Sequence, residues 1–583
     1  MLRHIRFTGG IPVRMKIRAK ARRFLSQLGN CRDVQLRVLQ QLLALNSESK
    51  FSQQHRLTSN LSLASFRNQV PARDFEYYRP WVEQVKNGQT DALLGSSNKL
   101  IMFAMSSGTT SQPKYIPITS RFVDQYRLGW QIWGINIFEE HRRLLWGKLF
   151  QLSGHHCRFK TSTGIPCGNI SGLVSSMQSP LVKSLYTAPA ELSLIGDHHI
   201  KLYAAIRTSI CCEHLTMMTT ANPSTLLQLA ETLAGHGETL VRDLHDGRFH
   251  FADQMSEPLP GWLLKKLRQQ SRPRAAQLQQ ILDCEGTLTP RSVWPMLSLL
   301  CVWTGGAAGA YVARMKQVFG DLPVRDHGLS ASEGRMTIPL QDEDPSGVLD
   351  IVSHFYEFIP EEEKDSHQPT VLLADELEEG RNYYILLTTA SGLYRYDIGD
   401  VVQCTGYRES TPLLKFLHKG KHAHSFTGEK LTEHQVVEAA RRTFGKSPLS
   451  YFTLAPVWDK VPGYRLMIEE PLLSQFHGKQ EHLAKSFESH LKQINCEYDE
   501  KIQSGRLQPI KIEVFPEGLW DRFVHEQVRD RQGTAEQYKH PCLTSDANYL
   551  KTLQNYVAHH AHEAPRPHFQ SRLRTAATTF KKY

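Results

Sequence analysis

Nine consecutive residues, 106–114, combine five hydroxyl side chains with a glycine and a closing lysine (Ser-Ser-Gly-Thr-Thr-Ser-Gln-Pro-Lys). They directly follow the apolar run Lys99–Met105, whose length and composition predict a strand. Small residues let backbone N–H groups approach an anion, hydroxyl groups donate to phosphate oxygens, and Lys114 adds positive charge. The segment therefore predicts a site for nucleotide phosphates, with a plain polar turn as the alternative. The pattern GxxxxGK[ST] is absent, which argues against the P-loop NTPases.

The same segment resembles the phosphate loop of adenylate-forming enzymes, whose usual form is SGTTGxPK, with Ser111 in place of the second glycine. The continuation Tyr115-Ile116-Pro117 narrows the resemblance to the auxin-responsive (Gretchen Hagen) family of acyl-acid amido synthetases. The resemblance implies that one group of residues binds the β- and γ-phosphates of ATP. This group consists of Ser106, Ser107, Gly108, Thr109, Thr110 and Lys114.

A second motif, RDHGLSASEGR, spans residues 325–335. It resembles the family's segment that faces the adenine and the α-phosphate, which implies nucleotide contacts from Ser330, Ala331 and Ser332. Glu333 is implied to hold Mg²⁺ and to act in catalysis, because a hard cation prefers carboxylate and phosphate oxygens and offsets the charge of departing pyrophosphate. Without the resemblance, Glu333 would be interpreted as a surface acid.

A third motif, GLYRYDIGDVVQCTGY (residues 392–407), is similar to the family's LYRYRVGDV segment. The resemblance implies that Asp400 accepts hydrogen bonds from both ribose hydroxyls, since a carboxylate offers two acceptor oxygens. The glycine-rich stretch 302–315 resembles the family's crossing behind the adenine and places Gly305 there. No GxGxxG fingerprint can be drawn from this stretch, which argues against a dinucleotide-binding oxidoreductase.

Two lysines of the C-terminal region complete the predicted site. The string TGEKLTEHQV resembles the loop that follows the family's hinge, which places Lys430 at the joint between two domains. The string EQYKHP is similar to the family's QYKTP and implies that Lys539 approaches the α-phosphate and the acyl oxygen. A lysine suits that task because its compact cation stabilises charge that grows in the transition state.

Together these motifs imply a ligase that uses ATP and Mg²⁺ to activate a small carboxylic acid as an acyl-adenylate. The acyl group then passes to an amine, which we expect to be an amino acid, so that an amide forms. Two alternatives stay open. The acceptor could be a thiol such as coenzyme A, or the chain could be a catalytically silent ATP-binding protein in which the departures at Ser111, Leu329 and Lys421 mark lost activity.

The elements that must position these residues fall into two groups. Helical periodicity over residues 34–42, followed by alternating helices and short apolar strands over 140–290, predicts an α/β body. The strings TVLLAD, NYYILLTT and LYRYDIGDVV predict antiparallel strands. After residue 428 a helix with a threonine start and a glycine stop, then strands and a second helix, predict a compact α+β unit.

We therefore expect a protein of the α/β class with two domains. The N-terminal domain, residues 1–424, is expected to be an adenylate-forming domain with mixed sheets and a small β-barrel-like part. It would hold the ATP and acyl-acid pockets. The C-terminal domain, residues 425–583, is expected to be a smaller, mobile α+β domain. Length alone favours such a division, because single cores rarely grow beyond about 300 residues.

Composition excludes several other classes. The chain has 69 Lys+Arg against 58 Asp+Glu, but much of the excess lies near its two ends and no aromatic residues interleave with it, so solvated charge is favoured over a nucleic-acid partner. Ten cysteines without a CxxC pair indicate reduced thiols and a cytoplasmic location. No run approaches the roughly 20 apolar residues of a membrane span. Nothing in the sequence indicates the oligomeric state.

Overall fold

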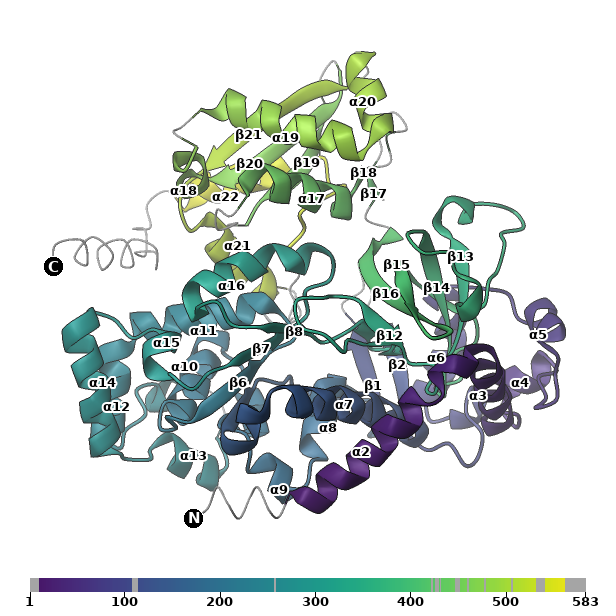
Figure 1. Cartoon of the computed structure of the whole chain (residues 1–583), viewed down its shortest axis with the longest axis horizontal. Coiled ribbons are helices and arrows are strands. Elements are labelled where there is room, and N and C mark those ends of the chain that lie inside the picture. Colours follow the sequence, from purple (N-terminus) through teal and green to yellow (C-terminus); the bar gives the residue numbers. More distant parts are fainter. Residues whose placement is uncertain are drawn as a thin grey trace.

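The computed structural model describes residues 10–106, 114–255, 258–420, 423–424, 429, 431–445, 451–458, 461–476, 479–504, 507–530 and 540–560. Helices form the first layer of the chain, at the purple end of the colour scale in Figure 1. They are α2 (Ile11–Leu25), α3 (Cys31–Leu45), α4 (Lys50–Gln54), α5 (Leu63–Gln69) and α6 (Phe75–Lys86). The predicted apolar face is confirmed in α3, where Val34, Val38 and Leu42 are buried.

Helix α3 also carries a buried polar contact to a distant part of the chain. The side-chain amide of Gln35 donates to the backbone oxygens of Ile351 and His354, both at 2.8 Å. Its oxygen accepts from the backbone N–H of Tyr356 at 2.9 Å. All donors and acceptors of this amide are therefore satisfied by residues more than 300 positions away, which fixes the N-terminal helices on the middle of the chain.

The predicted strand at residues 99–105 is present as β1 (Leu100–Ser106), which pairs antiparallel with β2 (Lys114–Thr119). Two short strands, β5 (Pro166–Gly168) and β4 (Phe159–Lys160), extend this sheet in the order β2-β1-β5-β4. The long helix α7 (Ser120–Glu140) begins directly after β2, and the Thr119 hydroxyl accepts from the backbone N–H of Phe122 at its start.

The centre of the large body is a parallel sheet in the order β3-β6-β7-β8. Its strands are β3 (Lys148–Gln151), β6 (Leu215–Thr219), β7 (Leu299–Val302) and β8 (Val324–Asp326). Every residue of β6 and β7 is buried, as expected of a parallel sheet covered on both faces. The covering helices shown in Figure 1 include α10 (His198–Ser209), α11 (Pro223–Gly235), α12 (Gly237–Asp246), α14 (Arg272–Glu285) and α16 (Val312–Phe319).

An antiparallel sheet in the order β11-β12-β16-β15-β14-β13 lies beside that body. Its strands are β11 (Thr337–Ile338), β12 (Gly347–Leu349), β13 (Phe355–Pro360), β14 (Asn382–Thr388), β15 (Tyr396–Arg408) and β16 (Thr411–Lys419). Two of the three predicted strands are thus confirmed. The third, over TVLLAD, is wrong: Leu372 forms only an isolated bridge with Phe358, and Ala374–Glu376 forms a short 3-10 helix in place of a strand.

The C-terminal unit is built on the sheet β19-β20-β21. Its principal elements are α17 (Glu433–Phe444), β19 (Thr453–Val457), β20 (Gly463–Glu469), α19 (Gln480–Ile494), β21 (Gln508–Phe515), α21 (Leu519–Asp530) and α22 (Tyr549–His559). The predicted start and stop of α17 are confirmed, because Thr432 forms a capping box with Gln435 and Gly445 follows the last turn. The predicted α+β composition of this unit agrees with these elements.

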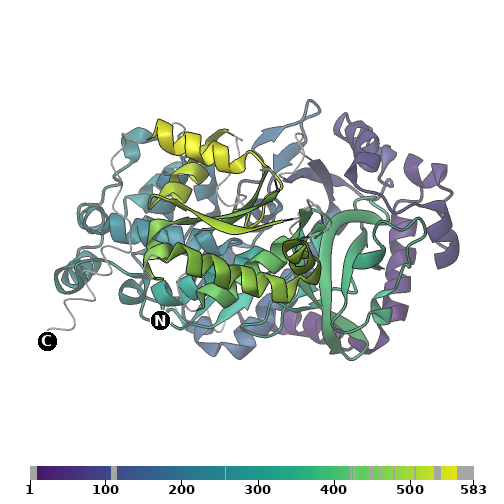
Figure 2. The ribbon, with the colours of Figure 1, turned by 90° about the horizontal axis from the view of Figure 1, so that it is seen from above.

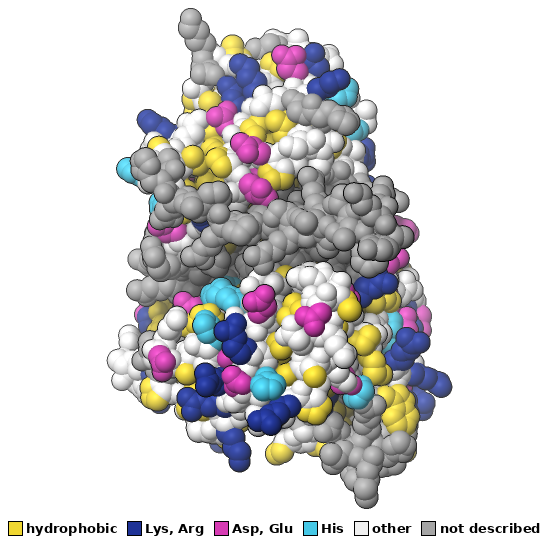
Figure 3. Space-filling model, turned by 90° about the vertical axis from the view of Figure 1, so that its left-hand side faces the viewer, with side chains coloured by type: hydrophobic (Ala, Val, Ile, Leu, Met, Phe, Trp, Pro, Cys, Tyr) yellow, Lys and Arg dark blue, Asp and Glu magenta, His cyan; other side chains and the backbone are white. Residues whose placement is uncertain are grey.

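Seen from above, the small unit covers the α/β body next to the antiparallel sheet (Figure 2). A side view shows basic and acidic side chains interspersed over the visible face (Figure 3). Among the described residues, no helix is both long and apolar enough to cross a membrane. The predicted α/β class, with mixed sheets in the large body, is confirmed.

Candidate active site

Strands β1 and β2 place two of the predicted phosphate-binding residues opposite each other. Ser106 ends β1 and is the register partner of Lys114, which begins β2. Lys114 is half-buried, and its Nζ lies 5.6 Å from the centre of the Phe75 ring. The remaining members of the predicted group, Ser107, Gly108, Thr109 and Thr110, and also Ser111, lie outside the described residues.

Glu333 lies in the turn of a short hairpin formed by β9 (Ser330–Ala331) and β10 (Gly334–Arg335). Ser330 is exposed and Ala331 and Ser332 are half-buried, yet Glu333 is only 6% exposed. The interpretation of Glu333 as a surface acid is therefore excluded. A Cβ at Gly334 would come within 2.5 Å of Nε2 of His354, so this side of the hairpin requires glycine.

Asp400 lies on β15 opposite Lys419, the last residue of β16. The Lys419 ammonium donates to Oδ1 of Asp400 and to the backbone oxygen of Ile398, the latter at 3.2 Å. Asp400 is 3% exposed, whereas 42% of the Lys419 side chain is exposed. Burial lowers the pKa of Lys419, but Asp400, Glu333 and other nearby acids outweigh this effect, so the pKa is raised and the lysine stays charged.

Electrostatics links these groups into one cluster. Burial raises the pKa of Glu333; the cations of Lys419 and Lys114 oppose this shift, and the carboxylate of Asp400 adds to it. The hydroxyl of Tyr396, the first residue of β15, donates to Oε1 of Glu333 at 3.2 Å. Glu333 thus lies within electrostatic range of one carboxylate and two ammonium groups; three of these four residues come from the three motifs, and Lys419 comes from β16.

The glycine-rich crossing after β7 packs against the same strand that carries Lys419. A Cβ at Gly305 would lie 2.7 Å from Nε1 of Trp303, and one at Gly306 would lie 3.0 Å from the backbone oxygen of Leu417. The rings of Trp303 and Phe416 are 5.3 Å apart. The crossing therefore approaches β16 as closely as only glycine allows.

Four further residues named from the sequence are Leu329, Lys421, Lys430 and Lys539. Leu329, one of the departures from the family's pattern, is buried in the hydrophobic core of the large body. Lys421, Lys430 and Lys539 lie outside the described residues. Neighbouring residues are described, however. Glu429 accepts from the hydroxyl of Tyr464 at 2.6 Å, and Nε2 of His540 lies 2.9 Å from the Thr453 hydroxyl, so the side chains of Glu429 and His540 are anchored in the small unit.

The small unit meets the large one beside the glycine-rich crossing. The 3-10 helix η6 (Gly306–Tyr311) packs against α17, and the rings of Tyr311 and Tyr451 are 5.6 Å apart. Next to this contact, Arg314 donates to Glu231 at 2.8 Å. The same guanidinium also lies close enough to Glu469 of the small unit to oppose the rise in pKa that burial causes in that carboxyl. Among the described residues, the carboxylates of Glu231 and Glu469 thus both lie near the guanidinium of Arg314.

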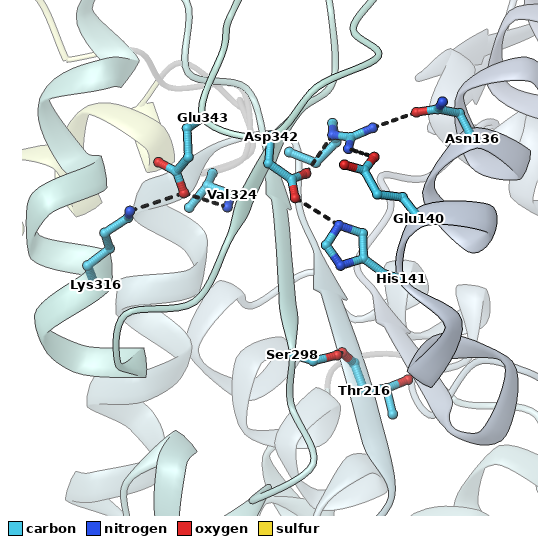
Figure 4. A network of polar contacts seen from close by, with 10 residues as sticks. Asn136, Glu140, His141, Thr216, Ser298, Lys316, Val324, Asp342 and Glu343 are labelled. Atoms are coloured by element: carbon cyan, nitrogen blue, oxygen red, sulfur yellow. Dashed lines mark hydrogen bonds and ion pairs between the residues drawn. The ribbon is translucent and has the colours of Figure 1, made fainter.

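A second polar cluster lies away from the site, at the end of α7 (Figure 4). Glu140, His141 and Asp342 bring three potential metal-ligand atoms close together. The fully buried guanidinium of Arg325 lies among them and donates to Glu140 at 2.5 Å, Asp342 at 2.7 Å and Asn136 at 2.8 Å. Because Arg325 already supplies the positive charge, we interpret the cluster as a clamp between α7 and β8.

Sequence reasoning missed Lys419, although a signal for it exists. A two-residue turn at positions 409–410 pairs Arg408 with Thr411, and counting back along both strands from that pair brings Asp400 opposite Lys419. The two ladder irregularities between these pairs compensate each other. Hairpin register alone would therefore have placed a lysine beside the predicted ribose-binding carboxylate.

Family models match most of the chain. The GH3 family N-terminal domain matches residues 20–324, the GH3 family central domain residues 347–419 and the GH3 family C-terminal domain residues 432–548. The predicted domain boundary near residue 424 falls in the interval between the second and third models.

Curated relatives and solved structures agree with these matches. Indole-3-acetic acid-amido synthetase GH3.4 of Arabidopsis thaliana is 25% identical over 596 residues, covering 97% of this chain and 98% of that protein. Probable indole-3-acetic acid-amido synthetase GH3.2 of Oryza sativa subsp. japonica is 24% identical and covers 90% of each. The structure of GH3.15 acyl acid amido synthetase superposes with a TM-score of 0.78 at 20% identity, over 91% of this chain and 94% of that one, which establishes a shared fold.

Proposed function

Since the chain belongs to the GH3 family, we propose that it is an ATP-dependent acyl-acid amido synthetase that joins a carboxylic acid to an amino acid through an acyl-adenylate. The observation that supports this proposal most directly is the cluster of Lys114, Glu333, Asp400 and Lys419. Its two cations and two carboxylates suit the polyanionic phosphates, the ribose and a metal ion, which supports the proposal.

In the first half-reaction a carboxylate oxygen of the acid attacks the α-phosphorus of ATP, and the bond to the bridging oxygen of the β-phosphate breaks. Ser106–Thr110 and Lys114 bind the departing β- and γ-phosphates. Ser330, Ala331 and Ser332 contact the adenine and the α-phosphate, with Gly305 behind the base. Asp400 accepts from the ribose hydroxyls through the oxygen that Lys419 leaves available.

The residues around Glu333 fit a bound Mg²⁺. The carboxylate of Glu333, which accepts from Tyr396 at Oε1, offers hard oxygen donors, and Mg²⁺ is typically held by one or two carboxylates together with substrate phosphates. When bound, the ion would offset the negative charge that accumulates on pyrophosphate. Glu333 contributes by remaining ionised in a buried position, which Lys419 and Lys114 favour.

In the second half-reaction the amine nitrogen attacks the acyl carbon, the bond to AMP breaks and the nitrogen loses a proton. Lys539 stabilises the negative charge of the transition state, and Lys430 acts at the joint between the domains. The relatives named for indole-3-acetic acid suggest that this chain also takes a small organic acid. A cytoplasmic location is supported by the thiols, since no described cysteine forms a disulfide.

The decisive experiment is ATP–pyrophosphate exchange over a panel of carboxylic acids, followed by mass spectrometry of products formed with a pool of amino acids and coenzyme A. An acid-dependent exchange and an amide product are expected. A thioester product would replace the amide assignment with the thiol alternative. If no acid supports exchange while the folded protein binds ATP, the chain is a silent ATP-binding protein.

A further inference from the structure

The carboxylate of Asp326 connects two of the segments assigned to the nucleotide. Asp326 ends β8 and is 2% exposed. Its Oδ2 accepts from both the backbone N–H of Thr304, at 2.5 Å, and the Thr304 hydroxyl, at 2.6 Å. Its Oδ1 accepts from the backbone N–H of Gly328 at 2.5 Å. Three donors from two different loops therefore converge on one buried carboxylate.

Both loops lead directly into the candidate site. Thr304 precedes Gly305 and Gly306, which pack against β16, and Gly328 precedes the residues that run to Glu333. These loops leave β7 and β8 at the carboxyl edge of the parallel sheet, where open α/β sheets bind their ligands. The position of one loop relative to the other thus depends on the carboxylate between them.

Asp326 itself is held firmly in place. Its backbone oxygen accepts from Nε1 of Trp133 at 2.8 Å, and Nε2 of the next residue, His327, lies 2.9 Å from the Thr219 hydroxyl on β6. A hydrogen bond to a charged group is about twice as strong as a neutral one. A rigid carboxylate that accepts from donors on two loops therefore fixes the position of one loop relative to the other.

We propose that Asp326 is a positioning residue of the amido synthetase, which holds the Thr304–Gly306 segment and the 328–332 segment at the separation that ATP requires. This inference rests on the proposed function, but Asp326 affects nucleotide binding, which precedes the chemical steps. Asp326 touches neither the substrate nor the reacting atoms in this arrangement; it acts through Thr304 and Gly328.

The charge state of Asp326 gives a readout that packing alone would not provide. Burial raises the pKa of this carboxyl to about 6, against the opposing effects of its three donors and of Arg335. Among the described residues, two titratable groups next to it are Cys301, whose pKa is raised, and His327, whose pKa is lowered to about 3, so neither changes charge between pH 5 and pH 8. ATP affinity should therefore fall as the pH drops through about 6, because a protonated carboxyl cannot accept all three bonds.

The test compares Asp326→Asn with Asp350→Asn in the full chain. Asp350 is 1% exposed and has a pKa raised by burial to about 6, but its carboxylate accepts from Ser353 and Val352 rather than from Thr304 and Gly328, which makes it a matched control. We expect Asp326→Asn to weaken MgATP binding at pH 8, measured by isothermal titration calorimetry, by roughly tenfold or more, and to make binding less dependent on pH near 6 than it is in the wild type. Asp350→Asn should change thermal stability and leave ATP affinity within about twofold.

Thr304 provides a second variant in case Asp326→Asn does not fold. Thr304→Val removes one of the three donors and should weaken MgATP binding by about fivefold, whereas Thr304→Ser keeps the hydroxyl and should bind like the wild type. Equal losses in Asp326→Asn and Asp350→Asn, or wild-type affinity in both Asp326→Asn and Thr304→Val, would overturn the inference. A wild-type protein that binds MgATP but supports no pyrophosphate exchange would instead refute the proposed function alone.

Discussion

The hydroxyl of Tyr396 donates to Oε1 of Glu333 at 3.2 Å, so the last residue of the Leu393–Tyr396 motif reaches the candidate metal ligand directly. The other members of the motif hold it in place. Tyr394 stacks on Phe51 with ring centres 5.5 Å apart, and Arg395 donates to Glu357 at 2.8 Å. Tyr396 therefore contacts the candidate site, whereas Tyr394 and Arg395 pack against the surrounding protein.

Replacing Tyr396 by phenylalanine should lower ATP–pyrophosphate exchange by about tenfold, because a hydrogen bond to a charged acceptor is lost while the ring remains. The pKa of Glu333 is already raised by burial, and loss of the donor should raise it further. Activity requires the carboxylate, so the acid limb should move to higher pH. Tyr394→Phe is the control, since its hydroxyl lies 3.4 Å from that of Ser52. An unchanged pH profile in Tyr396→Phe would contradict the assignment.

Lys419→Met should leave the buried carboxylate of Asp400 without its cation. We expect a loss of about 1–2 kcal/mol in the free energy of unfolding, less than for a fully buried pair because the lysine is partly exposed. The double variant Lys419→Met/Asp400→Asn should recover this stability but not ATP affinity, because the ribose acceptor is then weakened as well. Urea unfolding and calorimetric ATP binding separate the two effects. Recovery of ATP binding in the double variant would argue against a ribose contact at Asp400.

Glu469, at the joint between the two units, should make the free energy of unfolding decrease as the pH rises toward 7. Burial raises its pKa from 4.5 to about 7, with Asp521 adding to the shift and Arg314 opposing it. The folded state thus holds the proton more tightly than the unfolded state, and stability is lost between pH 4.5 and pH 7. Glu469→Gln should be more stable than the wild type at pH 8, by on the order of 1–3 kcal/mol, and similar at pH 4.

A control of opposite sign is available for this measurement. Hydrogen bonds from Arg441 lower the pKa of Glu438 to about 2, so its contribution is present above pH 4.5 and is lost as the pH falls toward 2. Glu438→Gln should therefore reduce stability at neutral pH. Thermal unfolding of both variants between pH 2.5 and pH 8 covers both titration windows; parallel curves for the two would exclude the proposed role of Glu469.

Gly306→Ala tests the approach of the glycine-rich crossing to β16. Gly306 has φ 56° and its added Cβ would lie 3.0 Å from the backbone oxygen of Leu417. Gly286 has φ 71° with open space around it, so Gly286→Ala measures the backbone cost alone, about 1 kcal/mol. We expect Gly306→Ala to destabilise further and to weaken ATP binding severalfold. Identical effects of the two substitutions would show that the close approach is unimportant.

Much of the arrangement could be predicted from the sequence, for physical reasons that differ between segments. The helix after Thr432 was predictable because its cap, periodicity and glycine stop agree. The strand before Ser106 was predictable because a short apolar run ends in small polar residues. By contrast, TVLLAD has the composition of a strand but pairs only through Leu372, and pairing depends on partners that composition does not reveal.

Some residues of the candidate site could likewise be predicted from the sequence, and others could not. Lys114, Glu333 and Asp400 could be named from motifs, whereas the burial of Glu333 could not, because a turn residue is exposed by default. Lys419 and Asp326 act through register and through contacts between loops that are far apart in sequence. Such contacts are set by the tertiary structure, so the residues that support a site are harder to predict than those that carry its motifs.

The contact between Gln35 and the backbone near Ile351 also governs the order of events during synthesis. The two residues are 316 positions apart, so α3 emerges from the ribosome long before the segment that satisfies its buried amide exists. At about 5–20 residues per second, that delay lasts roughly 15 to 60 seconds. For that interval the nascent amino end has an uncovered apolar face, and the large domain cannot reach its final state until the strands after residue 350 have been translated.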